Sequence, residues 1–254
     1  MILDNFRLDG RVALVTGASQ GLGQSMAIGL AEAGADIVAL DRNSSEQTGQ
    51  TVSGLGRRFK EVRCDLRQAA VADLQQIVAQ VVADLGQLDV LVNNAGIIRR
   101  APALDFSEAD WDDVLQINLK AAFFLSQAAA RVMMGQGGGK IVNIASMLSF
   151  QGGVIVPSYT AAKSGIAGVT RALANEWARH HINVNAIAPG YMATDNTAAL
   201  RADPDRSASI LDRIPAGRWG TPDDLKGAVV FLASAASDYM YGAIVPVDGG
   251  WLAR

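Results

Sequence analysis

Short runs with the character of strands, most of them apolar, alternate with longer stretches of helical periodicity along the whole chain. The runs, each five or six residues long, lie at 11–16, 36–41, 60–64, 88–92, 140–145, 183–187 and 243–247. Strands that are apolar throughout are typical of a parallel sheet with both faces covered, because neither face meets water. Helical crossovers connect such strands with a right-handed turn. The sequence therefore predicts an α/β fold with a doubly wound parallel sheet and helices on both faces.

The chain has the length and composition of one large domain. It has 254 residues, of which 50% are hydrophobic, and no linker, repeat or low-complexity stretch interrupts the alternation. We therefore expect a single domain over residues 1–254. The stretch 190–214 is more polar and contains Pro204, so we expect it to be an inserted substrate loop that covers a site at the strand ends.

Charge and cysteine content exclude several classes of function. The net charge is −3 with both signs scattered, and there is one cysteine, Cys64. No basic stripe predicts a nucleic-acid partner, and no apolar stretch approaches the ~18 residues of a membrane span. No cluster of His, Cys and acidic residues has metal-ligand spacing, so we expect no metal. A lone cysteine and the lack of a signal-like start favour a cytoplasmic protein.

Three glycines lie between the first apolar run and the first helical stretch. Gly17, Gly21 and Gly23 follow the spacing G-x-x-x-G-x-G. Glycines here let the chain turn sharply and let a pyrophosphate approach the helix N-terminus. A plain tight turn is the alternative, but the strand–loop–helix context favours a Rossmann-type dinucleotide-binding domain.

Asp41 ends the second apolar run and bears on the choice of dinucleotide. A carboxylate in this position accepts hydrogen bonds from the adenosine ribose and repels a 2′-phosphate, which favours NAD. Arg42 complicates this prediction, because a guanidinium beside it can hold the 2′-phosphate of NADP. Gln20 offers no positive charge where NADP would gain from one, so we predict NAD.

Tyr159 and Lys163 are four residues apart in a long helical stretch, so they lie on one face of that helix. A phenol has a pKa near ~10, and a neighbouring ammonium lowers it by favouring the phenolate. The pair thus predicts an acid/base group beside a redox cofactor. Ser146, directly after a strand, can orient a substrate carbonyl, and Asn118 can support a proton relay. Ordinary packing is the alternative for each residue alone.

Taken together, the chain resembles the classical short-chain dehydrogenase/reductase family from end to end. TGASQGLG, NNAG, Asn118, Ser146, YTAAK and Ala188-Pro189-Gly190 follow the order and spacing of that family. The resemblance implies catalysis by Asn118, Ser146, Tyr159 and Lys163, and commonly a homotetramer. It implies cofactor contacts at Gly17, Ser19, Gln20, Gly21, Leu22, Gly23, Asp41, Asp65, Leu66, Asn93, Ala95, Gly96, Tyr159, Lys163, Pro189, Gly190, Met192 and Thr194.

A narrower resemblance, to sugar-acid dehydrogenases within that family, concerns the substrate. It rests on stretches such as NNAGIIRR, IASMLSFQGG and VDGGWLAR. It implies that a hydroxyl and a keto group of a deoxy sugar acid are interconverted by hydride transfer, with Ser146 and Tyr159 contacting the substrate. Because a carboxylate needs a cationic partner, we expect Arg99 or Arg100 to anchor it. Further candidates for sugar hydroxyls or the carboxylate are Gln151, Tyr191 and Arg213.

Two other functions remain open from the sequence. A 3-oxoacyl-thioester reductase of the same family would use NADPH, and Asp41 argues against it. A non-catalytic dinucleotide-binding scaffold is the second alternative, and the complete Ser146, Tyr159 and Lys163 set argues against that. We expect Trp251 and the other tryptophans to serve in packing or subunit contacts.

Overall fold

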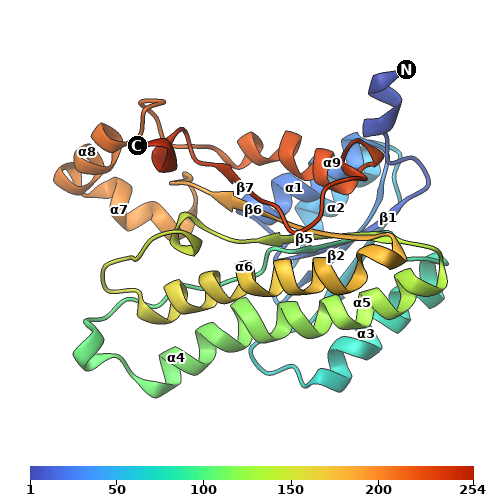
Figure 1. The fold of residues 1–254 in the computed structure, drawn as a ribbon, viewed down its shortest axis with the longest axis horizontal. Helices are drawn as coiled ribbons and strands as arrows, with labels where there is room; N and C mark the ends of the chain where they lie inside the picture. Colours follow the sequence, from blue (N-terminus) through green and yellow to red (C-terminus); the bar gives the residue numbers. More distant parts are fainter.

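Seven parallel strands form one twisted sheet at the centre of the molecule (Figure 1). The structure is a computed structural model that describes residues 1–254. The strand order is β3-β2-β1-β4-β5-β6-β7, which confirms the predicted doubly wound single domain. The strands are β1 (Val12–Thr16), β2 (Asp36–Asp41), β3 (Phe59–Arg63), β4 (Val90–Asn93), β5 (Gly139–Ile144), β6 (Ile182–Pro189) and β7 (Ile244–Val247).

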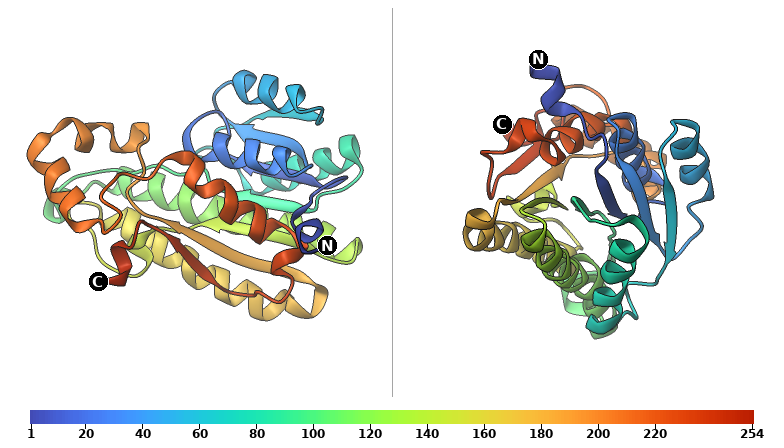
Figure 2. Two further views of the ribbon diagram at one scale, coloured as in Figure 1. Left: turned by 90° about the horizontal axis from the view of Figure 1, so that it is seen from above. Right: turned by 90° about the vertical axis from the view of Figure 1, so that its right-hand side faces the viewer.

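Helices cover both faces of the sheet, as Figures 1 and 2 show. One face carries α3 (Val71–Leu85), α4 (Glu108–Leu115), α5 (Ala122–Gly135) and α6 (Pro157–Trp177). The other face carries α1 (Gly21–Glu32), α2 (Glu46–Gly54) and α9 (Lys226–Ala233). None of these helices combines the length and the apolar character needed to cross a membrane.

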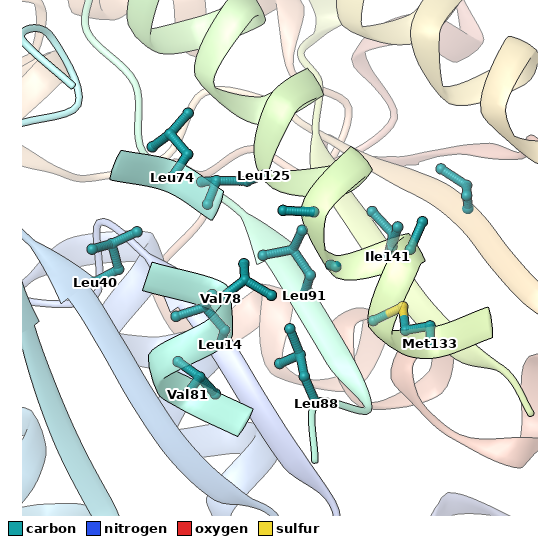
Figure 3. Close-up of a cluster of buried hydrophobic side chains, with 14 of the residues drawn as sticks. Leu14, Leu40, Leu74, Val78, Val81, Leu88, Leu91, Leu125, Met133 and Ile141 are labelled. Atoms are coloured by element: carbon teal, nitrogen blue, oxygen red, sulfur yellow. The ribbon is translucent and has the colours of Figure 1, made fainter. Parts of the chain in front are cut away.

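Alternate residues of the central strands supply two separate cores. Leu14 and Leu91 belong to the core beneath α3 and α5, which Figure 3 shows together with Leu125, Ile141 and Met133. Their neighbours Val15 and Val92 belong to the opposite core, against α1 and α9. Successive side chains of a strand point to opposite faces, so an apolar run fills both cores at once. This explains the unbroken apolar runs in the sequence.

The long helix predicted from 107 to 134 is interrupted in the structure. A π-helical segment, Gln116–Ala121, separates α4 from α5 and contains Asn118. The Asn118 amide accepts a hydrogen bond from the Ile97 N–H (2.9 Å) and donates one to the Ile97 carbonyl (2.9 Å). A π-helical turn inside a helix is frequently a functional feature. Here the π-helical turn holds Asn118 against the loop that follows β4. The turn lies at the point of the helix where the sequence suggested a bend.

The polar segment 190–214 contains two helices that the sequence analysis did not predict. These are α7 (Ala198–Ala202) and α8 (Pro204–Arg213), which lie beyond the ends of the strands (Figure 2). Asp203 caps α8 by accepting a hydrogen bond from the Arg206 N–H (3.0 Å), and Pro204 occupies its first turn. An Asp-Pro pair is a recognised helix start. The segment therefore contains two short helices and is not an irregular loop throughout.

The two-core arrangement predicts a large effect for a change in the middle of β4. Leu91 is completely buried, so Leu91→Ala should lower the free energy of unfolding by about 2–5 kcal/mol through lost burial and the cavity left behind. The matched control is Leu104→Ala, because Leu104 is 100% exposed and should change stability by less than about 0.5 kcal/mol. Urea denaturation measures both variants. Equal effects would contradict this account of the core.

Candidate active site

A single large cavity of about 1080 Å³ opens along the C-terminal ends of the strands. Strand β1 lies between β2 and β4, so the direction in which the chain adds strands reverses there. In open α/β sheets, ligands bind in the crevice at such a reversal. The cavity runs from the loop after β1 to the segment 190–214.

The glycine loop at one end of the cavity fits a pyrophosphate. Gly17 has φ +68°, a left-handed conformation that favours glycine, and a Cβ on Gly23 would collide with the Gly17 carbonyl and the Asn94 amide. Asn94 fixes the loop by donating hydrogen bonds to the carbonyls of Thr16 (2.9 Å) and Gly17 (3.2 Å). Helix α1 begins directly after this turn, so its first N–H groups face the cavity.

Asp41 lies next to the glycine loop at the end of β2. Its carboxylate accepts hydrogen bonds from the N–H groups of Ser19 (3.0 Å) and Asn43 (3.0 Å). These contacts hold the carboxylate at the cavity wall, where Arg42 also contributes to the lining. The cavity thus presents both a carboxylate and a guanidinium where an adenosine ribose would lie.

Tyr159 and Lys163 reach the cavity from the first turns of α6. The helix starts at Pro157, a residue suited to the first turn. The Lys163 Nζ lies 5.5 Å from the centre of the Tyr159 ring and donates a hydrogen bond to the Ile144 carbonyl (2.6 Å). Ser146, two residues beyond β5, is within hydrogen-bonding reach of the Tyr159 hydroxyl. The structure therefore brings the three predicted catalytic side chains together.

Burial shifts the pKa values of both Tyr159 and Lys163. Desolvation raises the pKa of Tyr159, and the hydrogen bond with Ser146 and the positive charge of Arg100 offset this only in part. Desolvation also lowers the pKa of Lys163, to about 8. The sequence suggested instead that Lys163 lowers the pKa of Tyr159. Burial is the largest effect on both groups, because it disfavours the charged form of each.

A buried polar network supports these residues from below. The Asn93 amide donates hydrogen bonds to Asn143 (2.9 Å) and Ser126 (2.9 Å), and Asn143 donates one to Thr170 of α6 (3.0 Å). The network therefore joins β4, β5, α5 and α6 behind the cavity. Asn93, predicted as a cofactor contact, lies in this network and not in the cavity wall, whereas its neighbour Asn94 does line the cavity.

Most of the predicted cofactor residues share the cavity. They are Gly17, Ser19, Gln20, Gly21, Leu22, Gly23, Asp41, Asp65, Leu66, Ala95, Gly96, Tyr159, Lys163, Gly190 and Thr194. Pro189 and Met192 lie outside it, with Met192 packed in the core beneath α9. Asn118 is 2% exposed and also lies behind the wall, in contact with the loop that contains Gly96.

The predicted substrate residues divide in a similar way. Lining the cavity are Ser146, Tyr159, Arg100, Gln151, Tyr191 and Arg213. Arg99 points elsewhere, because its guanidinium pairs with Asp110 (3.0 Å) and Asp113 (3.5 Å) of α4. Arg100 instead donates a hydrogen bond to the Asn196 carbonyl (3.2 Å) in the segment 190–214.

Several cavity residues were not predicted as part of a site. They are mainly apolar residues after β5 and one face of α8, including Met147, Leu148, Val154, Val156, Arg206, Ser209, Ile210 and Trp251. The α8 set has a signal in the sequence, since positions 206, 209, 210 and 213 share one helical face. Trp251 had no such signal, and its position follows only from the tertiary fold.

The fold and this side-chain set define a dinucleotide-linked oxidoreductase, and the chain belongs to the short-chain dehydrogenase/reductase family. The family model described as enoyl-(acyl carrier protein) reductase matches residues 17–252. A short-chain type dehydrogenase/reductase from Mycobacterium marinum is 36% identical and covers 100% of both chains, with a TM-score of 0.94.

More similar proteins have names that include sugar acids. The 2-dehydro-3-deoxy-D-gluconate 5-dehydrogenase of Escherichia coli strain K12 is 62% identical over 255 residues, 100% of both proteins. A 2-deoxy-D-gluconate 3-dehydrogenase from Agrobacterium tumefaciens, named as putative and with bound NADP, is 55% identical. It covers 98% of this chain and 99% of its own, with a TM-score of 0.92.

The buried ammonium predicts a specific pH dependence of stability. Below about pH 8 Lys163 is charged in both states, and the native protein bears the full desolvation penalty. Between about pH 8 and 10.5 the native state binds fewer protons than the unfolded state, so stability rises with pH. Relative to Lys163→Met, the wild type should gain up to roughly 3 kcal/mol over that interval. Urea denaturation without cofactor measures the free energy of unfolding of both proteins. A difference between them that stays constant with pH would contradict a lowered pKa for Lys163.

Proposed function

We propose that this chain is an NAD(H)-dependent oxidoreductase that interconverts a hydroxyl and a keto group on a deoxy sugar acid. The observation that carries the proposal is the shared cavity, with a loop suited to pyrophosphate at one end and Tyr159 with Ser146 at the other. The bound nicotinamide would supply or accept the hydride. Tyr159 gives or takes the proton at the substrate oxygen, and Ser146 orients that oxygen.

Lys163 and Asn118 have supporting roles in this proposal. Lys163 is buried beside Tyr159, so its charge acts there with little screening, and it would also hold the nicotinamide ribose. Asn118 fixes the loop after β4 through Ile97 and would support the proton relay behind the site. The remaining predicted cofactor residues would contact the dinucleotide along the cavity.

The proposed substrate class is 2-dehydro-3-deoxy-D-gluconate or 2-deoxy-D-gluconate. It is supported by the names of the relatives, above all the Escherichia coli protein of 62% identity. A physical argument points the same way, since Arg100 and Arg213 line the cavity and a sugar acid needs a cationic partner for its carboxylate. Arg100 is the member of the Arg99–Arg100 pair that we propose as the anchor, because Arg99 is neutralised by two aspartates.

We propose NAD as the preferred cofactor, with Asp41 as the reason. A fixed carboxylate at the ribose would repel a 2′-phosphate. The Agrobacterium protein contains NADP, as does a gluconate 5-dehydrogenase from Burkholderia cenocepacia in complex with NADP and tartrate, 41% identical over 100% of both chains with a TM-score of 0.95. NADP is therefore the necessary comparison in any test.

Three broader proposals accompany this function. The segment 190–214, with α7 and α8, would close over the substrate, since it contributes one wall of the cavity. A homotetramer is the proposed assembly, on the family resemblance. A cytoplasmic location is proposed because Cys64 is free and the chain contains no other cysteine.

Replacing the proposed acid/base group should separate binding from chemistry. Tyr159→Phe should lower kcat for oxidation of 2-dehydro-3-deoxy-D-gluconate by at least about 10³-fold, because the proton at the substrate oxygen has no acceptor. NADH should still bind within about threefold of the wild type. Absorbance at 340 nm measures turnover, with 2-deoxy-D-gluconate and a 3-oxoacyl thioester as parallel substrates. Turnover of the thioester alone, with NADPH, would favour the reductase alternative.

The cofactor proposal predicts opposite effects of two neighbouring substitutions. Asp41→Asn removes the charge that repels a 2′-phosphate, so the ratio of kcat/KM for NAD over NADP should fall about tenfold or more. Arg42→Ala removes the guanidinium that would attract that phosphate, so the same ratio should rise. A wild-type enzyme that prefers NADP would overturn the proposal.

Two adjacent arginines provide a matched test of the carboxylate anchor. Arg100→Ala should raise KM for the sugar acid at least tenfold, because it removes a cation from the cavity. Arg99→Ala is the control, since Arg99 pairs with Asp110 and Asp113 outside the cavity. An unchanged KM in Arg100→Ala would remove Arg100 from the role.

A further inference from the structure

Three side chains from distant parts of the chain meet at the substrate end of the cavity. Gln151 follows β5, Arg213 ends α8, and Trp251 belongs to the C-terminal 3-10 turn; we call these three residues the Arg213 cluster. The Arg213 guanidinium lies over the Trp251 ring at 4.0 Å. The Gln151 side-chain oxygen accepts hydrogen bonds from the Trp251 indole N–H (3.3 Å) and from Arg213 (3.4 Å).

These contacts determine which groups the cluster can offer to a ligand. Indole and guanidinium groups are donors only, so the Gln151 amide must turn its oxygen toward them and its NH₂ away. The only side-chain acceptor of the cluster is thereby occupied twice. What remains for a ligand is a set of N–H donors on Arg213 and Gln151, together with a positive charge that pairs with no carboxylate.

The cluster is held in place by the C-terminal segment. Trp251 is 5% exposed and packs against the Tyr191 ring at 4.9 Å. Arg254 donates a hydrogen bond to the Asp212 carbonyl (2.6 Å), and the Ala216 N–H donates one to the Gly249 carbonyl (2.9 Å). The end of α8 is therefore tied to the C-terminus, so the donors of Arg213 are positioned before a ligand arrives. Preorganised donors lose less entropy on binding.

We infer that the Arg213 cluster binds the 2-oxo carboxylate end of the substrate together with Arg100, the anchor proposed above, which also lines the cavity, and that the cluster thereby selects 2-keto sugar acids over 2-hydroxy sugar acids. A carboxylate with a keto group beside it presents three oxygen acceptors and no donor, which complements a cationic, donor-only site. A hydroxyl in place of the keto group adds a donor that finds no acceptor in the cluster. Unpaired polar groups in a site weaken binding and give selectivity. This inference rests on the proposed sugar-acid activity and refines it.

Binding to the enzyme–NADH complex tests the inference without turnover. The ligands are 2-dehydro-3-deoxy-D-gluconate and 3-deoxy-D-gluconate, which differ only in the keto or hydroxyl group at C2. NADH fluorescence gives the dissociation constants. We expect the keto acid to bind the wild type about tenfold more tightly. Dissociation constants within threefold of each other would overturn the inference. Absence of turnover, by contrast, would overturn the proposed function alone.

One substitution inverts the chemistry of the cluster at constant shape. Gln151→Glu replaces the free NH₂ donor with a carboxylate oxygen and pairs it with Arg213. The keto acid should then bind at least tenfold more weakly and lose its advantage over the hydroxy acid. NADH affinity and the melting temperature should remain at wild-type values, which shows that the fold is intact. Unchanged keto-acid binding in this variant would overturn the inference.

A control on α8 distinguishes the specific contacts of the Arg213 cluster from the general effect of a positive charge in the cavity. Arg206 also lines the cavity from α8 but donates no side-chain hydrogen bond and forms no ion pair. Arg206→Ala should change keto-acid binding by less than threefold; an effect as large as that of Gln151→Glu would contradict the inference. Trp251→Phe keeps a ring beneath Arg213 but removes the indole N–H. Because Trp251 only positions Gln151 and Arg213, this change should raise KM for the keto sugar acid severalfold and leave kcat nearly unaltered.

Discussion

The burial of the Lys163 ammonium beside Tyr159 is the interaction on which the rest of the site depends. Lys163 is 4% exposed, and the Ile144 carbonyl at the end of β5 accepts a hydrogen bond from its Nζ. Burying a charge with so few partners is unfavourable, which is why the pKa of Lys163 falls to about 8. The same exclusion of water raises the pKa of Tyr159. Burial thus disfavours the charged form of both Tyr159 and Lys163.

The scaffold around this pair is rigid for identifiable reasons. The Asn93–Asn143–Thr170 network ties the two central strands to α6 below Tyr159. Asn94 fixes the glycine loop through two backbone carbonyls, at the opposite end of the cavity. Asn93 and Asn94, which are neighbours at the end of β4, therefore support the Tyr159 end and the glycine-loop end of the cavity, respectively. Rigid supports of this kind keep a cofactor and a proton-transfer group in register.

Much of the fold could be predicted from the sequence because apolar runs and helical periodicity report burial directly. Six of the strands and the bend near Asn118 followed from that pattern, whereas β3 is a partly exposed edge strand with a mixed sequence. The helices of 190–214 did not, because a short polar helix lacks a strong apolar face; only Asp203 and Pro204 gave a start signal. The pairing of Arg99 with α4, rather than with the cavity, also depends on tertiary contacts.

The position of Trp251 illustrates what no local pattern contains. Its contacts, Gln151 and Arg213, are far away in sequence, and the fold alone brings them to one place. The direction of the Tyr159 pKa shift is a similar case. The spacing of Tyr159 and Lys163 indicates that they are close, but whether burial or charge dominates depends on how much water the site excludes.

The most direct test of the account is the pKa of the Tyr159 phenol, with and without the oxidised cofactor. Phenolate absorbance near 295 nm follows the titration, and subtraction of the Tyr159→Phe spectrum isolates this tyrosine from Tyr191, Tyr239 and Tyr241. The account predicts a pKa above the usual ~10 in the free enzyme and a fall of at least about one unit when NAD binds. A pKa that is the same in both states would contradict the proposed role of Tyr159 as an acid/base group controlled by buried charge.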